Sequence, residues 1–462
     1  MSEFSRSMTP TERRAAFSIA GIFSTRMLGL FMIFPVFALF AQEEFADVTA
    51  TQIGIAIGIY GLTQAFLQIP YGMLSDRFGR KPLIIVGMLV FMLGSIICAL
   101  AESIEMMIVG RAIQGMGAVA AVLMASVADL VSEQFRLRAM SIVGLTIGFS
   151  FTASLVVGPM LGELFGVRGI FWVIAGLGVL GIMLVLFAVP KIEQQSFQRE
   201  AEADPSQFKD VLKNPQLLRL DIGVFVLHAI LTAMFIVVPF LIRDTAGLDS
   251  MHHWELYLPV MLLSFVLMVP FIIQAESKGR MKPIFVGAIL TISLMQLALL
   301  YGASGFWSVF LILMVFFTAF NLLEASLPSL VVKLSPADKK GTASGVYSSS
   351  QFFGAAFGGA LGGWLYQTFG LEGLFGFTAA IGFLWFLLAA TMVKPMPLSI
   401  ASVPITAKLE DAELPGLVEK LLTYDGVNEV VFRLDEQRVY FKVDRQKVDE
   451  AGLIEYLEKG LS

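Results

Sequence analysis

Long apolar runs, separated by short polar segments, fill the chain from residue 15 to residue 393. A helix needs roughly 20 predominantly apolar residues to cross the ~30 Å hydrocarbon core of a bilayer. Each run has about this length, so the pattern predicts an all-α membrane protein with twelve transmembrane helices. The predicted spans are 15–41, 51–74, 82–101, 104–131, 138–165, 169–189, 216–242, 253–274, 283–301, 307–333, 341–366 and 371–393.

The polar connections alternate in their content of Lys and Arg. The N-terminus and the even-to-odd connections carry 18 basic residues, whereas the opposite connections carry only Arg168 and Arg243. Because basic loops stay in the cytoplasm, we expect a multi-pass protein whose two termini and middle loop are all cytoplasmic.

The first six spans and the last six repeat each other. A shift of 200 residues places Pro70 on Pro270 and the charged segment Asp76–Pro82 on Glu276–Pro283. Two parallel six-helix repeats are typical of carriers whose halves rock about a site at the membrane midplane. We therefore predict an N-terminal six-helix bundle over 1–189, a cytoplasmic middle loop over 190–215 and a C-terminal six-helix bundle over 216–394.

The pattern changes after a predicted linker at 395–402. An initial strand near Ser402–Ala407 would complete a β-α-β-β-α order, which is typical of a small ferredoxin-like α+β domain. We predict this soluble, cytoplasmic domain over 403–462. Its other expected elements are a helix at Leu414–Thr423, strands at Val427–Leu434 and Arg438–Val443, and a helix at Val448–Lys459.

The order of these elements resembles that of metal-carrier domains, which hold a CxxC motif between the first strand and the first helix. The corresponding stretch, Ile405–Glu410, contains neither Cys nor His. Thiolate metal binding is therefore excluded. A carboxylate site around Glu410, Asp411 and Glu413 is a weak alternative to an accessory domain without a metal. We predict no metal and no cofactor.

Composition agrees with a surface that faces lipid. The chain is 56% hydrophobic and 15% charged, whereas a soluble protein carries roughly 25% charged residues. The whole net charge of −5 arises from residue 395 onward, so the membrane part has no basic patch for nucleic acid. The single cysteine, Cys98, permits no disulfide within the chain. No nucleophile–base pair, nucleotide loop or metal cluster is present, and we expect no enzyme.

Several polar side chains lie inside the predicted spans, where ionisable groups are costly and indicate function. At 1.5 Å per residue, Arg26 and His228 lie roughly 17 and 18 Å inside their helices, near the midplane. Asp221 is close enough to the cytoplasmic end to reach water. We hypothesise that six of these side chains line one central polar cavity. They are Arg26, Arg111, Gln114, His228, Asn321 and Glu324.

Glu324 is the first candidate for proton coupling, because a carboxyl group removed from water can carry a proton at neutral pH. His228 is the second, because imidazole titrates near that pH. The alternative is a static ion pair between Glu324 and Arg26 or Arg111, which locks helices together and transports nothing.

The connection between the second and third spans carries a dense motif, Gly72–Lys81. Gly79 supplies the backbone freedom that a tight turn needs, and Arg80 and Lys81 hold the turn at the cytoplasmic surface. Asp76, at the membrane boundary, favours a helix N-terminus or a cation. The positions that define the motif are Gly72, Asp76, Arg77, Gly79, Arg80 and Lys81.

This motif resembles the loop 2–3 signature of the major facilitator superfamily, G-x-L-a-D-R-x-G-R-K, with Ser75 at the weak small-residue position. The fourth span resembles the helix-four signature of that family, R-x-x-Q-G-x-G, through Arg111, Gln114 and Gly115. On these motifs, residues 1–394 are identified as a member of the superfamily.

The fifth span resembles the drug:proton antiporter branch of the superfamily in part. Gly158, Pro159 and Gly162 fit the helix-five signature of that branch. Ser154 and Glu163 stand where the signature has glycines, which weakens the inference of antiport.

The family resemblance also implies contacts for the loop motif. Asp76 would face the N-terminus of helix eleven, near Gly341–Ser344, and Arg80 would pair with Asp129 at the inner end of helix four. Such contacts would latch the two halves together when the site opens outward, as a two-state gate requires. A loop with a purely topological role is the alternative.

The leading interpretation is a secondary active transporter of the bacterial inner (plasma) membrane, which exports a small amphipathic solute, coupled to protons, by alternating access. A facilitator or importer of a small metabolite would need the same fold. A membrane sensor that signals through its C-terminal domain without transport is the alternative from another class. The expected partners are a small-molecule substrate, protons and the lipid bilayer, without nucleic acid, and a single chain is expected to suffice.

Overall fold

The computed structural model describes residues 8–190, 208–335, 340–393, 398–404, 414–433 and 438–444, together with residues 448 and 452. The chain divides into two compact units. One comprises Met1–Phe271 and Pro283–Met392 and contains the helical bundle, and the other comprises Ile272–Lys282 and Val393–Ser462 and contains a small sheet.

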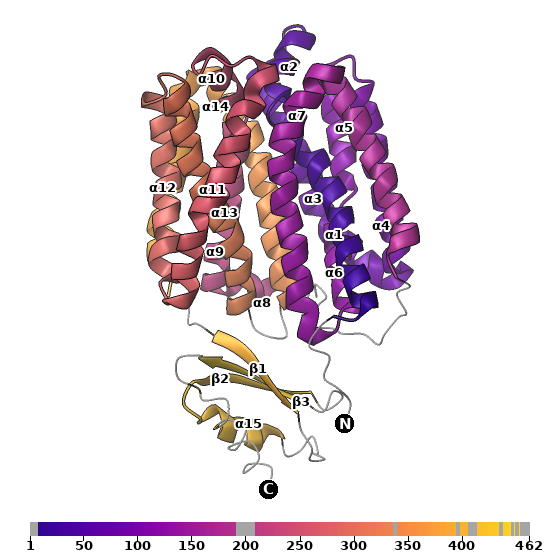
Figure 1. The fold of residues 1–462 in the computed structure, drawn as a ribbon, viewed down its shortest axis with the longest axis vertical. Helices are drawn as coiled ribbons and strands as arrows, with labels where there is room; N and C mark the ends of the chain where they lie inside the picture. Colours follow the sequence, from indigo (N-terminus) through magenta and orange to yellow (C-terminus); the bar gives the residue numbers. More distant parts are fainter. Residues whose placement is uncertain are drawn as a thin grey trace. The chain divides into compact units, whose positions relative to one another are not determined.

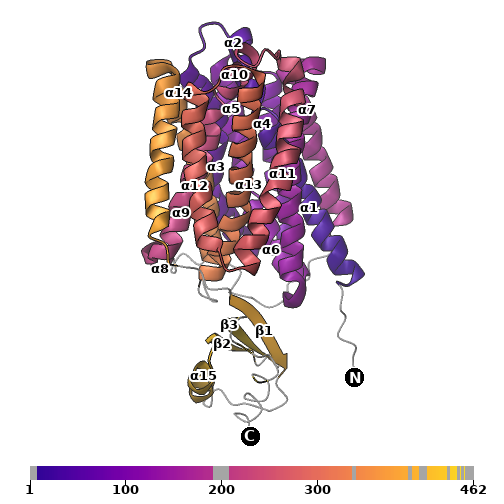
Figure 2. The same cartoon turned by 60° about the vertical axis from the view of Figure 1, so that its left-hand side comes forward.

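Long helices run side by side through the helical unit (Figure 1, Figure 2). Nine helices of the described residues are long and apolar enough to cross a membrane. Two of them, α7 (Glu133–Met183) and α14 (Lys340–Ala390), are broken at glycines with positive φ, Gly166 and Gly370. Both breaks coincide with predicted boundaries, so α7 and α14 each supply two spans.

The remaining apolar run of the prediction corresponds to α1 and α2 together, and the described residues thus accommodate all twelve predicted spans. We call the end of the helical unit at which α1 and α9 begin the inner end, and the opposite end the outer end. The other helices are α1 (Pro10–Phe31), α2 (Phe37–Glu44), α3 (Ala50–Phe78), α4 (Arg80–Ala99), α5 (Ile104–Met116), α6 (Ala120–Leu130), α8 (Phe208–Lys213), α9 (Pro215–Met234), α10 (Val238–Asp244), α11 (His253–Ser277), α12 (Met281–Tyr301) and α13 (Phe306–Leu334), with a π-helical turn at Leu184–Ala188 and a 3₁₀ turn at Ser250–His252.

Three spans are interrupted along their length. α1 gives way to α2 at residues 32–36, α5 to α6 at 117–119, and α9 to α10 at 235–237. A broken helix is tolerated in a membrane where protein shields the freed backbone groups, and Ile33 and Phe235 in these stretches have no exposed surface. The breaks in the first and seventh spans occupy corresponding positions of the two halves, in agreement with the internal repeat.

Glycines bring α14 into backbone contact with helices of both halves. A Cβ atom on Gly354 would lie 2.1 Å from the carbonyl oxygen of Phe225 in α9, and a Cβ atom on Gly54 of α3 would lie 2.0 Å from that of Gly359. Small residues allow membrane helices to approach this closely. The contact between α3 and α14 near the outer end, here called the glycine seam, consists of Ala50, Gly54, Gly58 and Gly61 against Phe352, Ala356, Gly359 and Gly363.

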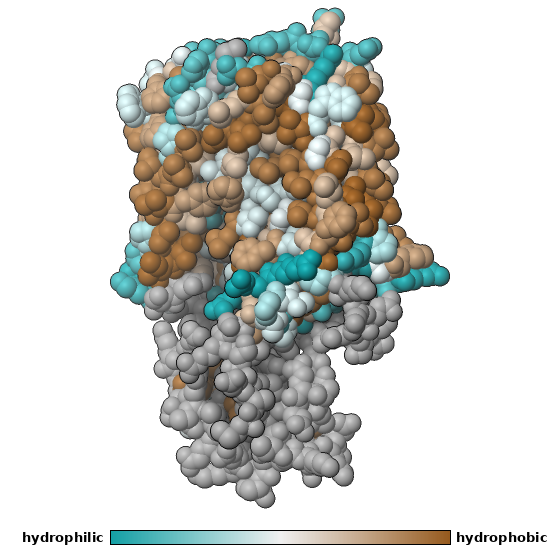
Figure 3. Space-filling view, turned by 45° about the vertical axis from the view of Figure 1, so that its right-hand side comes forward, coloured by the Kyte–Doolittle hydropathy of each residue, from teal (hydrophilic) through white to brown (hydrophobic). Residues whose placement is uncertain are grey.

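The flank of the helical unit is apolar. Figure 3 shows a broad band of hydrophobic side chains on one face, with hydrophilic side chains towards the two ends. Large side chains such as Leu145 (76% exposed) and Phe187 (72% exposed) are not covered by protein. Soluble proteins rarely leave large contiguous apolar surfaces open to water. The chain is therefore a membrane protein, and this band faces lipid.

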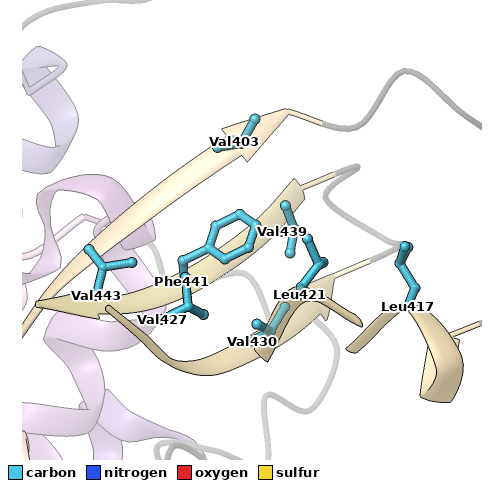
Figure 4. Packing of buried hydrophobic residues seen from close by; sticks show 8 residues of the cluster. All are labelled: Val403, Leu417, Leu421, Val427, Val430, Val439, Phe441 and Val443. Atoms are coloured by element: carbon cyan, nitrogen blue, oxygen red, sulfur yellow. The ribbon is translucent and has the colours of Figure 1, made fainter. Parts of the chain in front are cut away.

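The second unit contains a three-stranded sheet of order β1-β3-β2, in which both pairings are antiparallel. α15 (Leu414–Leu422) connects β1 (Leu398–Pro404) with β2 (Val427–Arg433), and β3 (Arg438–Asp444) lies between these two strands in the sheet. Figure 4 shows the apolar side chains of the helix and the three strands gathered into one core. Its members are Val403, Leu417, Leu421, Val427, Val430, Val439, Phe441 and Val443.

The first strand begins earlier than the sequence predicts. β1 starts at Leu398, opposite Asp444, because pairing along the whole length of β3 draws part of the predicted linker 395–402 into the sheet. The carboxylates Glu410, Asp411 and Glu413 lie outside the described residues, as do residues 191–207 of the middle loop and most of the predicted helix at 448–459. The ferredoxin-like assignment stays a prediction.

Candidate functional site

A buried arginine lies in the first span. Arg26 of α1 has no exposed surface, and its Nη2 donates to Tyr60 Oη at 2.9 Å and to Gln64 Oε1 at 2.8 Å, both on α3. Its Nε and Nη1 have no hydrogen-bond partner, and the guanidinium lies 5.8 Å from the centre of the Phe91 ring. Arg26 is thus a buried cation held by neutral groups.

A second buried arginine, Arg111 of α5, contacts the same tyrosine. Its guanidinium lies 4.9 Å from the centre of the Tyr60 ring, within the range of a cation–π contact. Nε donates to the carbonyl of Ala56 at 3.3 Å, and Nη1 bonds to Gln114 Oε1. A Cβ atom on Gly115 would lie 2.2 Å from the Tyr60 carbonyl oxygen, so this glycine allows the approach that places the arginine over the ring. No sequence motif singled out Tyr60, which resembles the other aromatic residues of the apolar runs.

Tyr60→Phe removes one of the two partners of Arg26 and keeps the ring beneath Arg111. We expect the lost hydrogen bond to a buried charge to lower the free energy of unfolding by about 2 kcal/mol. The melting temperature of the purified protein in detergent measures this change. Tyr301→Phe, at a position that is 79% exposed, is the matched control and should have no effect. Equal melting temperatures for the two variants would contradict the prediction.

The second half holds a histidine and a glutamate in contact. His228 Nε2 of α9 lies 3.7 Å from Glu324 Oε2 of α13. Gln351 of α14 joins them, since its Nε2 lies 2.8 Å from His228 Nε2 and 3.4 Å from Glu324 Oε1. We call these three side chains the acid–histidine cluster. It links three helices, and Gln351 was missed in the sequence because nothing distinguishes it from the Ser and Gly residues around it.

The contacts of the His228 ring match the imidazole form with a hydrogen on Nδ1. Nδ1 lies 3.2 Å from the carbonyl oxygen of Val224, which can only accept, so Nδ1 carries a hydrogen. The neutral ring then accepts from the Gln351 amide through Nε2. A second proton on Nε2 would displace that amide and produce an imidazolium beside Glu324. The Glu324 side chain is 33% exposed, so the cluster is not sealed within the protein.

Five of the six polar side chains expected in one cavity lie in two groups, one in each half: Arg26, Arg111 and Gln114 beside Tyr60, and His228 with Glu324. Asn321, one turn before Glu324 on α13, turns to α11 and donates to Ser264 Oγ at 3.0 Å. Among the ion pairs of the described residues, none joins Glu324 to Arg26 or Arg111. The static ion pair considered as an alternative is therefore not formed in this structure, because the arginines face Tyr60 within their own half.

Aromatic side chains from both halves meet beside these clusters. Phe320 of α13 lies 6.1 Å from the His228 ring and 6.0 Å from Phe151 of α7, measured between ring centres. Phe34 and Phe235, in the breaks of the first and seventh spans, are 5.3 Å apart. The boundary between the halves is therefore apolar at this point.

The loop motif folds around Arg80. Gly79 has a φ of 89°, which requires the backbone freedom predicted for it. Arg80 Nε donates to Asp129 Oδ2 at 2.8 Å, which is the pair that the family resemblance implies. Arg80 Nη1 donates to Ser75 Oγ at 2.6 Å and bonds to Asp76. Ser75 thus supplies an acceptor that the alanine of the family signature lacks.

The remaining motif positions have different surroundings. A Cβ atom on Gly158 would lie 2.3 Å from the first backbone carbonyl of the break after α1, so this glycine packs α7 against that break. Lys81 Nζ donates to the carbonyl of Val189 at 2.7 Å. At Gly72 and Gly162, an added Cβ atom would meet nothing closer than 3.6 Å.

Known proteins resemble this chain over most of its length. Residues 19–292 and 274–410 match the family described as the Major Facilitator Superfamily. The chain is 43% identical over 437 residues to the inner membrane transport protein YajR of Escherichia coli (strain K12), covering 95% of each protein. It is 25% identical over 351 residues to the multidrug resistance protein MdtH of Proteus mirabilis (strain HI4320), covering 74% of this chain and 84% of that protein. Its fold matches a crystal structure of a D-xylose-proton symporter with a TM-score of 0.66 and 14% identity, covering 83% of this chain and 98% of that one.

Proposed function

The chain belongs to the Major Facilitator Superfamily, and from this membership we propose that it exports a small amphipathic solute in exchange for protons by alternating access. The family and the fold make the chain a transporter of small molecules and not an enzyme. We place it in a bacterial inner membrane with both termini in the cytoplasm, so that the inner end faces the cytoplasm. YajR is named an inner membrane transport protein, which supports transport, and MdtH is named a multidrug resistance protein, a role that export of a solute would serve.

The acid–histidine cluster is the observation that carries proton coupling. A proton on His228 Nε2 breaks its contact with Gln351 and strengthens its attraction to Glu324, and these residues belong to three different helices. One of these helices, α14, also forms the glycine seam with α3 of the first half. Protonation can therefore favour one arrangement of the halves over the other, which is the condition for a ligand to shift a conformational equilibrium.

The glycine seam supports an inward-facing assignment of this structure. Backbone meets backbone near the outer end, and the Thr51 hydroxyl adds a hydrogen bond to Gln367 Oε1 across the same boundary. With Phe34 against Phe235 deeper inside, the outer side of the pathway is closed. Alternating access then requires the seam to open in the other state.

Asp129→Asn tests the role of the loop motif. We propose that Asp76 binds the start of α14, near Gly341–Ser344, in the outward-facing state, as the family resemblance implies. Arg80 binds both Asp76 and Asp129 in this structure. When Asp129 is replaced, Asp76 is the carboxylate that remains to pair with Arg80, so it is less available to contact α14. Because a partly exposed ion pair contributes about 1 kcal/mol, the outward-facing population should fall roughly fivefold.

The measurement is the rate at which an impermeant maleimide labels a cysteine placed at Thr51, in a Cys98→Ser background. Thr51 is half-buried in this structure and its hydroxyl donates to Gln367 Oε1, so a faster labelling rate reports opening of the outer side. Asp244→Asn, at an exposed position, is the control. If the Asp129→Asn variant is labelled at the same rate as the protein with the wild-type motif, the loop has a purely topological role.

The proposed function is tested with the full-length protein in proteoliposomes. A pH gradient is imposed, a panel of amphipathic compounds is offered, and a trapped pH-sensitive dye records proton flux. We expect at least one compound to move against its gradient while protons move down theirs. Movement of a compound without proton flux would instead indicate a facilitator. Absence of transport for every compound would favour the sensor.

A further inference from the structure

Asp221 and His253 are ionisable side chains with buried polar atoms that have no hydrogen-bond partner. Asp221 of α9 is 5% exposed, and the atom concerned is Oδ2. The expectation that Asp221 reaches water was wrong, because 94% of the apolar window of the seventh span is buried by other helices. His253 is enclosed more completely, and it lies at the outer end, where α11 begins.

His253 is the first residue of α11 and follows the 3₁₀ turn at Ser250–His252. Its side chain has no exposed surface, and neither Nδ1 nor Nε2 has a hydrogen-bond partner. The backbone carbonyls of Leu248 and of Pro35, in the break after α1, lie near the ring without accepting a hydrogen bond from it. Burial without a partner disfavours the charged ring most strongly, since nothing replaces its lost hydration. The site therefore holds an uncharged imidazole.

His253 lies at the boundary between the halves. The 3₁₀ turn that precedes it packs against α7 of the first half. Its ring lies 6.4 Å from that of Tyr257, whose buried Oη also has no hydrogen-bond partner. The Tyr257 ring lies 6.4 Å from Phe235, which contacts Phe34 of the first half. A continuous path of packed side chains thus joins His253 to the contact that closes the outer side.

The charged side chains around the ring do not favour an imidazolium. In the second half, Asp249 and Arg243 act on the ring with opposite signs. In the first half, residues 32–36 contain no ionisable side chain, and Glu163 of α7 acts on His252 instead. Asp249 already binds His252, whose Nδ1 lies 2.6 Å from its Oδ1. A second proton on the buried ring would therefore be an uncompensated charge in this closed state.

We propose that His253 is a proton sensor of the outer side, whose protonation holds the outer end open, an inference that rests on the proposed alternating access. When the halves separate along the glycine seam, the ring loses its cover from the first half and reaches water. A proton then binds the lone pair of the ring nitrogen that carries no hydrogen. The resulting imidazolium cannot return to the closed boundary without losing its hydration. An acidic outer side thus keeps the outer end open until the proton leaves.

Proton linkage sets the sign and the size of this effect. The open state binds the proton and the closed state does not, so the open population rises as the pH falls. An imidazole in water is half protonated near pH ~6.5. Lowering the pH from about 8 to about 5 should therefore multiply the ratio of open to closed molecules by roughly thirty.

The experiment is double electron–electron resonance on the full-length protein in lipid nanodiscs, with spin labels on cysteines that replace Glu102 and Thr368 in a Cys98→Ser background. Both labelled positions are exposed, and they lie at the outer end of the first and the second half, respectively. Opening lengthens the distance between the labels, and the two distance populations give the ratio of open to closed molecules. This ratio is measured at both pH values.

His252→Gln is the matched control, because this neighbouring histidine is exposed and already paired with Asp249. Any response of the acid–histidine cluster is common to all variants, so it cancels in the comparison. We expect the pH response of His253→Gln to be roughly thirtyfold smaller than that of His252→Gln. Should His253→Gln not fold, His253→Phe decides in its place, since it keeps an uncharged ring beside Tyr257.

The outcomes separate this inference from the proposed function. Equal pH responses in His252→Gln and His253→Gln would overturn the proton sensor and leave alternating access standing. A single distance at both pH values in every variant would show that the outer end does not open, and the proposed function and the inference would then fail together.

Discussion

Replacing Glu324 with Gln is expected to abolish transport driven by a pH gradient. Glutamine keeps the size of the side chain and its contact with Gln351, but it cannot take up or release a proton. If Glu324 carries the proton, its loss should reduce the rate to that of empty vesicles, a fall of roughly a hundredfold or more. Accumulation of a transported compound in proteoliposomes under an imposed pH gradient measures this rate.

Two comparisons keep this result specific to the proton. Glu255→Gln removes an exposed carboxylate on α11 and should transport at the wild-type rate. Exchange of labelled for unlabelled solute, which needs no net proton movement, should persist in Glu324→Gln. Unchanged accumulation in that variant would rule out Glu324 as the proton carrier and leave His228 as the candidate.

The arrangement of spans could be predicted from the sequence, because the thickness of the bilayer requires apolar runs of a fixed length. The boundaries at Gly166 and Gly370 were predicted, and each is a glycine with positive φ. The breaks within the first and seventh spans were not predicted. They depend on surrounding helices that bury the freed backbone, and hydropathy along one run holds no information about those neighbours.

The candidate site could be predicted from the sequence only in part, for a related reason. Charged residues inside a span are conspicuous, so Arg26 and Glu324 could be selected one at a time. Their neutral partners, Tyr60 and Gln351, are identified only by contacts between helices that are distant in sequence. Asp221 shows the same limit, because its depth along α9 could be counted but the burial of α9 could not.

The loop motif shows what a resemblance adds. The pairing of Arg80 with Asp129 spans 49 residues, and no periodicity in the sequence connects these positions. The family signature implied it, and the structure contains it. The contact of Asp76 with Gly341–Ser344 stays a prediction.

Gly54→Val is expected to prevent closure of the outer side and so to stop transport. A Cβ atom at this position would already lie 2.0 Å from the carbonyl oxygen of Gly359. Backbone atoms cannot move aside as a flexible side chain can, so α3 and α14 must separate. An overpacking cost of about 3 kcal/mol would reduce the closed population by roughly a hundredfold.

Closure is measured by cross-linking cysteines placed at Thr51 and Gln367, whose side chains are hydrogen-bonded across the seam, in a Cys98→Ser background. Gly54→Val should lose the cross-link and the transport activity together. Gly287→Val is the matched control, since a Cβ atom there meets nothing within 4 Å. A wild-type yield of cross-link in Gly54→Val would show that the seam can close around a side chain. Because this change leaves Glu324 and His228 untouched, loss of transport would separate the movement of the halves from the chemistry of the proton.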